Sequence, residues 1–404
     1  MARLRNFNGI LKNKKMNFIN IHDLENQIFG KNSKFKLKKK QEKELKNDFK
    51  RSRILICGAA GSIGKAFALK LKNYDMSKVI FLDKDENSLT ELNREINLIY
   101  KNKIIRDFIC QDINNFNIHN FLKSEKISHF FNFAALKHVR SEENFHSLNY
   151  LIKTNCISPF QLGNLNRLRN LKKIFFISTD KTVYPSSLMG CSKKVMENEL
   201  FKQKRRFSKK FISTVRFANV SFSNGSLLKN IYEKTLASVP VGVPDNISRY
   251  FVTHSEGADL CLISLLKESD GCIIIPTYKS VGNSINLKEL TVQIIKKLNK
   301  KPIFVEKILK QKGKIQQILL EKREIIGQKN KEFFYEKNEK LVSFRDDVRI
   351  KKIYLYKNSD SKIYSKLFKK SKTVKDIYKG FKKIFIKSSY NMNEIKKVYL
   401  KNII

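Results

Sequence analysis

A hydroxyl, a carboxylate and an amine stand side by side at Thr179, Asp180 and Lys181. They follow the apolar run 174–177, which predicts a buried strand. Open parallel sheets place their sites at the carboxyl ends of strands, and a positioned acid and amine can transfer protons there. We therefore predict catalytic roles for these three residues. A polar loop that simply follows a strand is the alternative interpretation.

A helical pattern comes next and carries Met189 and Lys193. Residues four apart share one face of a helix, so these two side chains are predicted to face the same space. That space is the region next to Thr179, Asp180 and Lys181. We therefore add Met189 and Lys193 to the candidate catalytic residues.

A glycine-rich turn lies between a short apolar run and an amphipathic pattern, which is the context that a dinucleotide fingerprint requires. Gly58 permits the tight turn, Gly61 lets the backbone approach a pyrophosphate, and Gly64 lets the helix pack on the sheet. The start of that helix offers free N–H groups to the negative charge. The turn residues predicted to bind the cofactor are Gly58, Gly61, Ser62, Ile63 and Gly64.

Acidic residues end the next two predicted strands. Asp83 is placed to accept hydrogen bonds from the adenosine ribose and to repel a 2′-phosphate, which favours NAD over NADP. Lys84 beside it weakens that preference, and a plain turn residue is the alternative interpretation of Asp83. Asp112 and Ile113 end the third predicted strand and resemble the adenine-contacting pair of dinucleotide-binding sheets.

A fourth strand is predicted over 129–135, and its last residues, Ala134 and Ala135, would let the backbone pass close to a cofactor. His138 follows, and a structural histidine is the alternative to a binding role. Asn155 is predicted near the start of the next helix, where it either contacts the cofactor or is an ordinary polar helix residue.

Strands that alternate with helical patterns predict an α/β fold: a Rossmann-type doubly wound parallel sheet with a smaller C-terminal α/β substrate-binding lobe. Residues 1–50 are predicted to be a polar, lysine-rich N-terminal arm whose 34–50 helix is exposed. Residues 51–280 form the NAD-binding domain with the active site, and 215–255 contribute to the substrate lobe. Residues 281–404 form the C-terminal substrate lobe and a basic tail.

The chain has 404 residues, 41% of them hydrophobic, and a formal net charge of +45. That charge could indicate nucleic-acid binding, but the lysines are spread through every segment and no base-reading motif accompanies them. We therefore expect no nucleic-acid partner, whereas a cationic surface would attract a substrate that carries a diphosphate.

Compartment and metal content are also predicted from the sequence. The six cysteines form no CxxC pair and have no histidine at ligand spacing, so we expect buried free thiols and no metal site. We see no run long enough to span a membrane and no signal peptide, which predicts a cytoplasmic protein.

Taken together, the motifs resemble the UDP-N-acetylglucosamine 4,6-dehydratases. These are extended short-chain dehydrogenase/reductases of the capsular polysaccharide biosynthesis type, and the closest likeness is to the soluble branch of the legionaminic acid pathway. The likeness covers residues 50–280 well and 281–350 loosely. The motifs are Gly58 to Gly64, Ala134 to Val139, Ser178 to Lys181, Pro185 to Lys193, Arg216 to Val220, and Arg249 to Thr253.

The resemblance implies an internal redox cycle: oxidation at sugar C4, loss of water across C5 and C6, and return of the hydride to C6. Lys181 would be the C5 base, Asp180 the acid at the C6 oxygen, and Thr179 a hydrogen-bond donor to the C4 oxygen. Lys193 matches the lysine that holds the nicotinamide ribose. Met189 departs from the general pattern because it replaces the tyrosine of that motif. The base for C4 oxidation stays open among Asp180, Thr179 with a water, and Tyr184.

The resemblance also implies binding residues for the cofactor and for a UDP-sugar. Lys137, Asn155 and Lys193 join the residues predicted to bind NAD. The residues predicted to bind substrate are Lys137, His138, Asn219, Ser223 and Arg249. A homo-oligomer is expected. The alternatives are a UDP-sugar 4-epimerase of the same fold and a non-catalytic protein that binds a nucleotide or a nucleic acid.

Overall fold

The structure is a computed structural model of the chain. It describes residues 19–157, 162–310, 313–321, 332–344 and 347–354, together with positions 376 and 379. The predicted basic tail, from about residue 355, therefore lies almost wholly outside the described residues.

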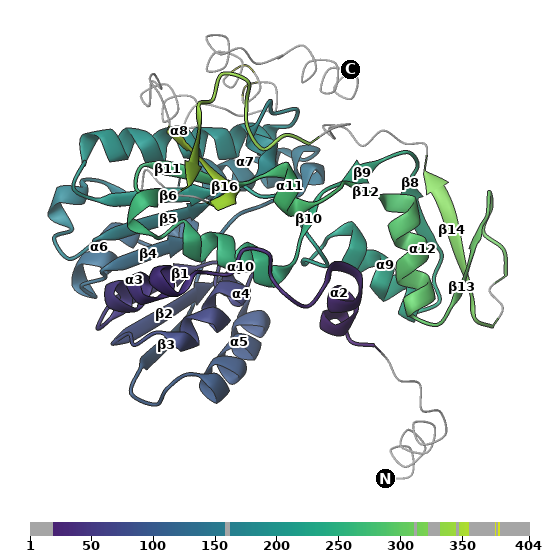
Figure 1. Ribbon diagram of the computed structural model, residues 1–404, viewed down its shortest axis with the longest axis horizontal. Helices are drawn as coiled ribbons and strands as arrows, with labels where there is room; N and C mark the ends of the chain where they lie inside the picture. The colour runs from purple at the N-terminus through teal and green to yellow at the C-terminus, as the bar shows by residue number, and fades with distance from the viewer. Residues whose placement is uncertain are drawn as a thin grey trace.

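A parallel sheet forms the centre of the larger lobe (Figure 1). Its seven parallel strands are ordered β3-β2-β1-β4-β5-β6-β11, so the strand order reverses between β1 and β4 as in a doubly wound sheet. This confirms the predicted fold class. The strands are β1 Arg53–Cys57, β2 Lys78–Asp83, β3 Ile105–Cys110, β4 His129–Asn132, β5 Lys173–Ile177, β6 Phe211–Val215 and β11 Cys272–Pro276.

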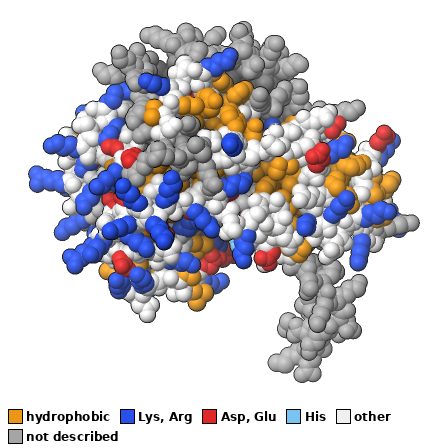
Figure 2. All heavy atoms as spheres, in the orientation of Figure 1, with side chains coloured by type: hydrophobic (Ala, Val, Ile, Leu, Met, Phe, Trp, Pro, Cys, Tyr) orange, Lys and Arg blue, Asp and Glu red, His pale blue; other side chains and the backbone are white. Residues whose placement is uncertain are grey.

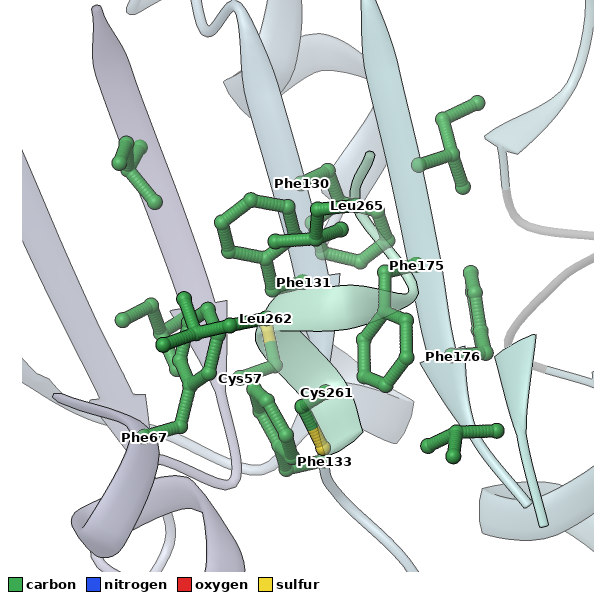
Figure 3. Close-up of a cluster of buried hydrophobic side chains, with 14 of the residues drawn as sticks. Cys57, Phe67, Phe130, Phe131, Phe133, Phe175, Phe176, Cys261, Leu262 and Leu265 are labelled. Atoms are coloured by element: carbon green, nitrogen blue, oxygen red, sulfur yellow. The ribbon is translucent and has the colours of Figure 1, made fainter. Parts of the chain in front are cut away.

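The central strands are apolar on both faces because helices cover both faces of the sheet. Phe131 of β4 and Phe175 of β5 are register partners, and their rings meet edge to face. The rings of Phe130 and Phe176 also meet edge to face. Figure 3 shows Phe131 and Phe175 beside Cys261 and Leu262 on one face of the sheet. Phe130 and Phe176 alternate with them along the strands and extend from the opposite face. This core fixes the carboxyl ends of β4 and β5, from which candidate site residues extend.

Helices flank the parallel sheet and follow its strands in the expected alternation. α4 starts at the glycine turn, as the fingerprint predicts, and α8 carries Met189 and Lys193. The helices of this lobe are α4 Ser62–Lys70, α5 Glu86–Ile99, α6 Ile118–Ser124, α7 Phe145–Ile152, α8 Leu188–Arg206, α10 His254–Ile263 and α11 Tyr278–Val281.

A smaller lobe lies beside the large one in Figure 1 and has its own apolar core. In the described part of the chain, its sheet has the order β13-β14-β8. Two short strand pairs, β7 with β10 and β9 with β12, lie in the same part of the chain. The elements are β7 Asn219–Val220, α9 Leu227–Leu236, β8 Val241–Pro244, β9 Ser248–Arg249, β10 Phe251–Val252, β12 Ile285–Asn286, α12 Leu287–Lys297, β13 Lys301–Phe304 and β14 Ile315–Glu321.

The predicted assignment of all residues after 281 to the smaller lobe or tail does not match the sheet topology. β15 (Leu341–Phe344) and β16 (Asp347–Tyr354) extend the large sheet instead. β16 pairs antiparallel with β11, and β15 pairs antiparallel with β16. The chain therefore leaves the smaller lobe after β14 and returns to the large one.

The N-terminal arm packs against both lobes. α2 (Ile21–Phe29) lies in the core of the smaller lobe through Leu24, and the ring of Phe29 contacts Phe222 and Phe251. α3 (Lys39–Phe49) was predicted to be exposed, which is wrong for one of its faces. Its Leu45 and Phe49 are fully buried in the core of the large lobe. The lysine-rich composition of α3 hides this narrow apolar face.

Lysine and arginine side chains are scattered over the visible face of both lobes in Figure 2, most densely on the large lobe. Among the described residues, no helix is both long and apolar enough to cross a bilayer. All six cysteines carry free thiols; five are buried and Cys110 is exposed.

Candidate active site

The turn after β1 leaves no room for a side chain at Gly58 or Gly64. A Cβ on Gly58, whose φ is +69°, would lie 2.4 Å from the backbone nitrogen of Ala134. A Cβ on Gly64 would lie 2.1 Å from the carbonyl oxygen of Gly58. Gly61 is the N-cap of α4, so the N–H groups of the first turn, including those of Ser62 and Ile63, lack intrahelical acceptors. Such a cradle can hold a pyrophosphate.

Acidic side chains border this turn at the ends of β2 and β3. The Asp83 carboxylate accepts a hydrogen bond from the Ala60 N–H at 2.9 Å, which ties it to the glycine turn. Asp112 accepts from the Tyr150 hydroxyl at 2.7 Å, and Ile113 beside it is buried. These residues lie at the edge where the adenosine half of a dinucleotide would lie.

Asn155 was predicted near the start of a helix, and this is wrong. It lies in a π-helical turn, Lys153–Ile157, that extends the end of α7. Its amide accepts from the Leu136 N–H at 3.0 Å and donates to the Leu136 carbonyl at 2.8 Å and to the Ser192 hydroxyl at 3.1 Å. Asn155 therefore holds the loop after Ala134 and Ala135 against α8.

Three candidate catalytic side chains meet where β5 ends. Asp180 is 2% exposed, and its Oδ1 accepts from Thr179 Oγ1 at 2.8 Å. Lys181 Nζ lies 3.3 Å from the same oxygen and 3.3 Å from Asn219 Oδ1. The Lys181 side chain keeps 35% of its surface exposed. A buried carboxylate thus contacts an amine that an external molecule can reach.

α8 brings its two predicted residues to the same region. Lys193 Nζ donates to the Ile177 carbonyl at 3.1 Å, and burial lowers the pKa of Lys193 to about 8. Met189 is buried, and its N–H donates at 2.8 Å to Glu142. Burial raises the pKa of Glu142 to about 7. Sequence reasoning missed Glu142, which caps the start of α8.

Lys137 and His138 lie near Lys181 and beside the loop that carries Ser223. Lys137 Nζ donates to Ser223 Oγ at 3.0 Å. Burial and then the charges of Lys181 and Lys229 lower the pKa of Lys137 to about 8. A Cβ on Gly225 would lie 2.7 Å from the His138 ring, so this ring packs against the loop that carries Ser223. Clustered amines of this kind favour an anionic ligand.

Asn219 and Arg249 are held by a residue that no motif indicated, Glu332. Glu332 is 5% exposed. One of its oxygens accepts from Asn219 Nδ2 at 2.7 Å and lies 3.4 Å from Arg249 Nε. The other accepts from the Tyr250 N–H at 2.9 Å. Arg249, predicted to bind substrate, is thus paired with a carboxylate of its own chain.

A buried network of ion pairs contacts the candidate catalytic loop, residues 178–182. The Arg216 guanidinium is fully buried. It forms bidentate salt bridges with Glu197, at 2.8 and 2.7 Å, and with Glu339, at 2.8 and 2.8 Å. Glu197 also accepts from the Ser178 hydroxyl at 2.6 Å and from the Thr182 hydroxyl at 3.3 Å. Ser178 and Thr182 stand on either side of the residues 179–181.

Tyr184 was one candidate base for C4 oxidation. Its φ is +43°, which is unusual for a residue other than glycine. Its hydroxyl accepts from the Lys337 N–H at 2.7 Å, and its ring meets Phe333 edge to face. The side chain is therefore directed at the segment 332–340. Within the described residues, no cluster of histidine, cysteine or acidic side chains could hold a metal ion.

The sequence profile of the polysaccharide biosynthesis protein family matches residues 54–358. The chain belongs to this family. Among its relatives, the capsular polysaccharide biosynthesis protein CapD of Staphylococcus aureus is 28% identical over 253 residues, which are 61% of this chain and 41% of CapD. The match therefore spans less than half of CapD. The uncharacterized membrane protein MJ1061 of Methanocaldococcus jannaschii is 30% identical over 77% of this chain and 97% of its own length.

Other relatives carry named reactions. The UDP-glucose 4-epimerase of Rickettsia bellii is 27% identical over 59% of this chain and 70% of the epimerase. Among solved structures, Pen from Bacillus thuringiensis has a TM-score of 0.62 at 20% identity, over 77% of this chain and 89% of Pen. The dTDP-glucose 4,6-dehydratase of Bacillus anthracis, solved with NAD, has a TM-score of 0.50 at 18% identity, over 66% and 84% of the two chains. At these identities the structural likeness shows the fold alone.

The family confirms the coarser part of the sequence-based prediction, a polysaccharide biosynthesis protein with the fold of sugar-nucleotide epimerases and dehydratases.

Proposed function

We propose that this family member is an NAD-dependent 4,6-dehydratase that converts UDP-N-acetylglucosamine to UDP-2-acetamido-2,6-dideoxy-hexos-4-ulose and water. The observation that carries the proposal is the contact of Asp180 with Lys181 at the end of β5. An elimination across C5 and C6 uses a base at C5 and an acid at the C6 oxygen, and this pair can supply both.

The residues present fit a nicotinamide dinucleotide. The cradle built by Gly58, Gly61 and Gly64 would take the pyrophosphate, and Asp83 would take the adenosine ribose. Lys193 would hold the nicotinamide ribose, and burial of its amine lowers its pKa to about 8. When bound, NAD supplies a reversible hydride acceptor.

The chain's own groups then handle the protons. The Lys181 amine would take the C5 proton from the 4-keto sugar, and the electron pair left at C5 would expel the C6 hydroxyl. Asp180 would donate a proton to that oxygen so that it leaves as water, and Thr179 would donate a hydrogen bond to the C4 oxygen. The proton that Asp180 gives to the C6 oxygen would be the one it takes, through Thr179, from the C4 hydroxyl at the oxidation step. Lys181 would return a proton to C5 as C6 receives the hydride, so both residues would end the cycle in the state in which they began it.

Met189 cannot act as the proton acceptor for oxidation at C4. Tyr184 is directed at the segment 332–340, which favours Asp180, or Thr179 with a water, for this step. We propose Asp180 because its Oδ1 already accepts the hydrogen bond from Thr179 Oγ1, so a proton can pass from the sugar hydroxyl through Thr179.

Substrate binding would use the amines of the site. Burial, and then the charges of Lys181 and Lys229, lower the pKa of Lys137. An anion bound between Lys137 and Lys229 would offset the repulsion of their charges. We propose that they contact the diphosphate of the UDP-sugar. Ser223, which accepts from Lys137, would hold the amine in place.

The test is incubation of the purified protein with UDP-N-acetylglucosamine in heavy water, followed by NMR of C5 and C6. We expect a C6 methyl signal and deuterium at C5. Lys181→Ala should lower turnover about 10²- to 10⁴-fold, the usual worth of a positioned proton-transfer group, with little change in substrate affinity. Lys43→Ala, an exposed lysine of α3, is the matched control. Near-normal turnover in Lys181→Ala would remove the base assignment.

The second candidate is a UDP-sugar 4-epimerase, because the Rickettsia bellii relative carries that name. Epimerisation keeps the C6 hydroxyl and exchanges no hydrogen at C5. A C4 epimer with an intact C6 hydroxyl, formed without deuterium at C5, would favour this reaction over the dehydratase.

A further inference from the structure

Glu332 joins two strands that carry predicted site residues. Its carboxylate contacts Asn219 of β7, Arg249 of β9, and the backbone N–H of Tyr250. It is separated from Asn219 by 113 residues of sequence. Burial and then the negative charge of Asp180 raise the pKa of Glu332, which places the two acids in the same buried environment.

The contacts of the Asn219 amide fix its orientation. Its Nδ2 donates to Glu332 at 2.7 Å and to the Tyr250 carbonyl at 3.1 Å. Both partners are acceptors, so the NH₂ group of the amide must face them. The amide oxygen must then face Lys181 Nζ, at 3.3 Å. A reversed amide would lose both of these bonds.

This orientation determines where the lone pair of Lys181 points. A neutral amine has two N–H donors and one lone pair. Asp180 Oδ1 and Asn219 Oδ1 both accept from Lys181, so the two N–H groups are used and the lone pair points away from both oxygens. If the amide turned over, its NH₂ group would face the amine and would bind the lone pair instead.

We infer that Glu332 is a positioning residue for Lys181: by orienting the Asn219 amide, it leaves the lone pair of the Lys181 amine free to accept a proton. The inference rests on the proposed function, because a free lone pair matters only if Lys181 is a base. It deepens that function, since it adds a residue from the C-terminal part of the chain to a site that sequence motifs place entirely within residues 58–253.

The kinetic test compares Glu332→Ala, Asn219→Ala and the double variant in turnover of UDP-N-acetylglucosamine. Glu332→Ala should lower kcat and the rate of C5 deuterium incorporation about 10- to 100-fold, with KM changed less than about threefold. Because Glu332 acts through Asn219, the double variant should be no slower than Asn219→Ala. Additive losses in kcat, or a loss seen only in KM, would overturn the inference.

A second readout needs no turnover. The full-length protein is treated with a trace of acetic anhydride, and labelling of Lys181 is measured by peptide mass spectrometry against the exposed Lys43. Acylation requires a free lone pair, so Glu332→Ala should slow Lys181 labelling about 10-fold, whereas the double variant with Asn219→Ala should restore it. Equal labelling in wild type and Glu332→Ala would refute the inference.

The two proposals fail separately. A wild-type protein that leaves UDP-N-acetylglucosamine unchanged but shows the expected labelling pattern would refute the dehydratase and keep the role of Glu332. Glu143→Ala, which removes an exposed glutamate, controls for the loss of an acid, and thermal unfolding checks that each variant folds.

Discussion

Glu197→Ala should strongly destabilise the protein and disturb the catalytic loop. The substitution removes one of the two carboxylates that neutralise the fully buried Arg216. Removing one partner of a buried ion pair costs about 3–5 kcal/mol, because the remaining charge is left without water or a counter-charge. Glu339 still contacts Arg216 and reduces this cost, whereas the lost hydrogen bond from Ser178 adds about 1 kcal/mol. We expect a net loss of about 4 kcal/mol.

The assay is urea denaturation followed by circular dichroism, which gives the free energy of unfolding and the m-value. Glu233→Ala is the matched control. Glu233 is an exposed glutamate of α9 that lies 3.8 Å from Lys229, and its removal should change the unfolding free energy by less than about 0.5 kcal/mol. An unfolding free energy for Glu197→Ala within about 1 kcal/mol of wild type, at an unchanged m-value, would refute the reasoning.

If Glu197→Ala does not fold, Glu197→Gln keeps the side-chain volume and one acceptor oxygen. We expect it to fold, to lose about 1–3 kcal/mol, and to turn over UDP-N-acetylglucosamine more slowly. Slower turnover follows because Ser178 and Thr182, both bound to Glu197, stand on either side of the candidate catalytic residues. Full wild-type turnover would show that the network does not position the loop.

Three further outcomes are expected. Lys137→Met should weaken UDP-sugar binding, measured by calorimetry. The pKa of Lys137 is about 8 and an anion binds the charged amine, so the affinity of the wild type should fall as pH rises through 8, and the variant should lack this pH dependence. Gly64→Ala should lower the stability of the protein by about 1–3 kcal/mol, because its Cβ would lie 2.1 Å from the Gly58 carbonyl oxygen. Gly61→Ala, whose Cβ would lie 3.3 Å from that oxygen, should keep the stability and weaken NAD binding. Burial alone would raise the pKa of Glu339, but the Arg216 guanidinium holds this pKa at about 2. The stability that the Glu339 carboxylate contributes should therefore be present above pH 4.5, its ordinary pKa, and be lost as pH falls towards 2. Glu339→Gln should flatten that part of the curve of unfolding free energy against pH.

The parts of the fold that the sequence predicted well are those set by local patterns. The apolar runs that became β1, β2, β5 and β6 are buried from both sides, so they contain few polar residues and are easily seen. The glycines of the turn were equally clear, because a Cβ on Gly58 or Gly64 would lie 2.1–2.4 Å from backbone atoms and no other residue type fits there.

The errors arose where packing overrides composition. The lysine-rich sequence of α3 indicated an exposed helix, yet Leu45 and Phe49 on one face are sufficient to fix it in the core. Asn155 was expected near a helix start because polar residues favour that position. In the structure it is buried at a helix end, where the backbone of Leu136 satisfies its amide.

The sequence by itself determined the sheet, the glycine cradle and the grouping of Thr179, Asp180 and Lys181, since each depends on residues close together in the chain. Only the tertiary structure revealed Glu332 and Glu339, which reach Asn219 and Arg216 across more than a hundred residues of chain. A buried charge needs a partner of opposite sign at short distance, but nothing in that requirement fixes the partner's place in the sequence. Pairings of this kind therefore leave no periodicity or spacing to read, and folding alone brings them together.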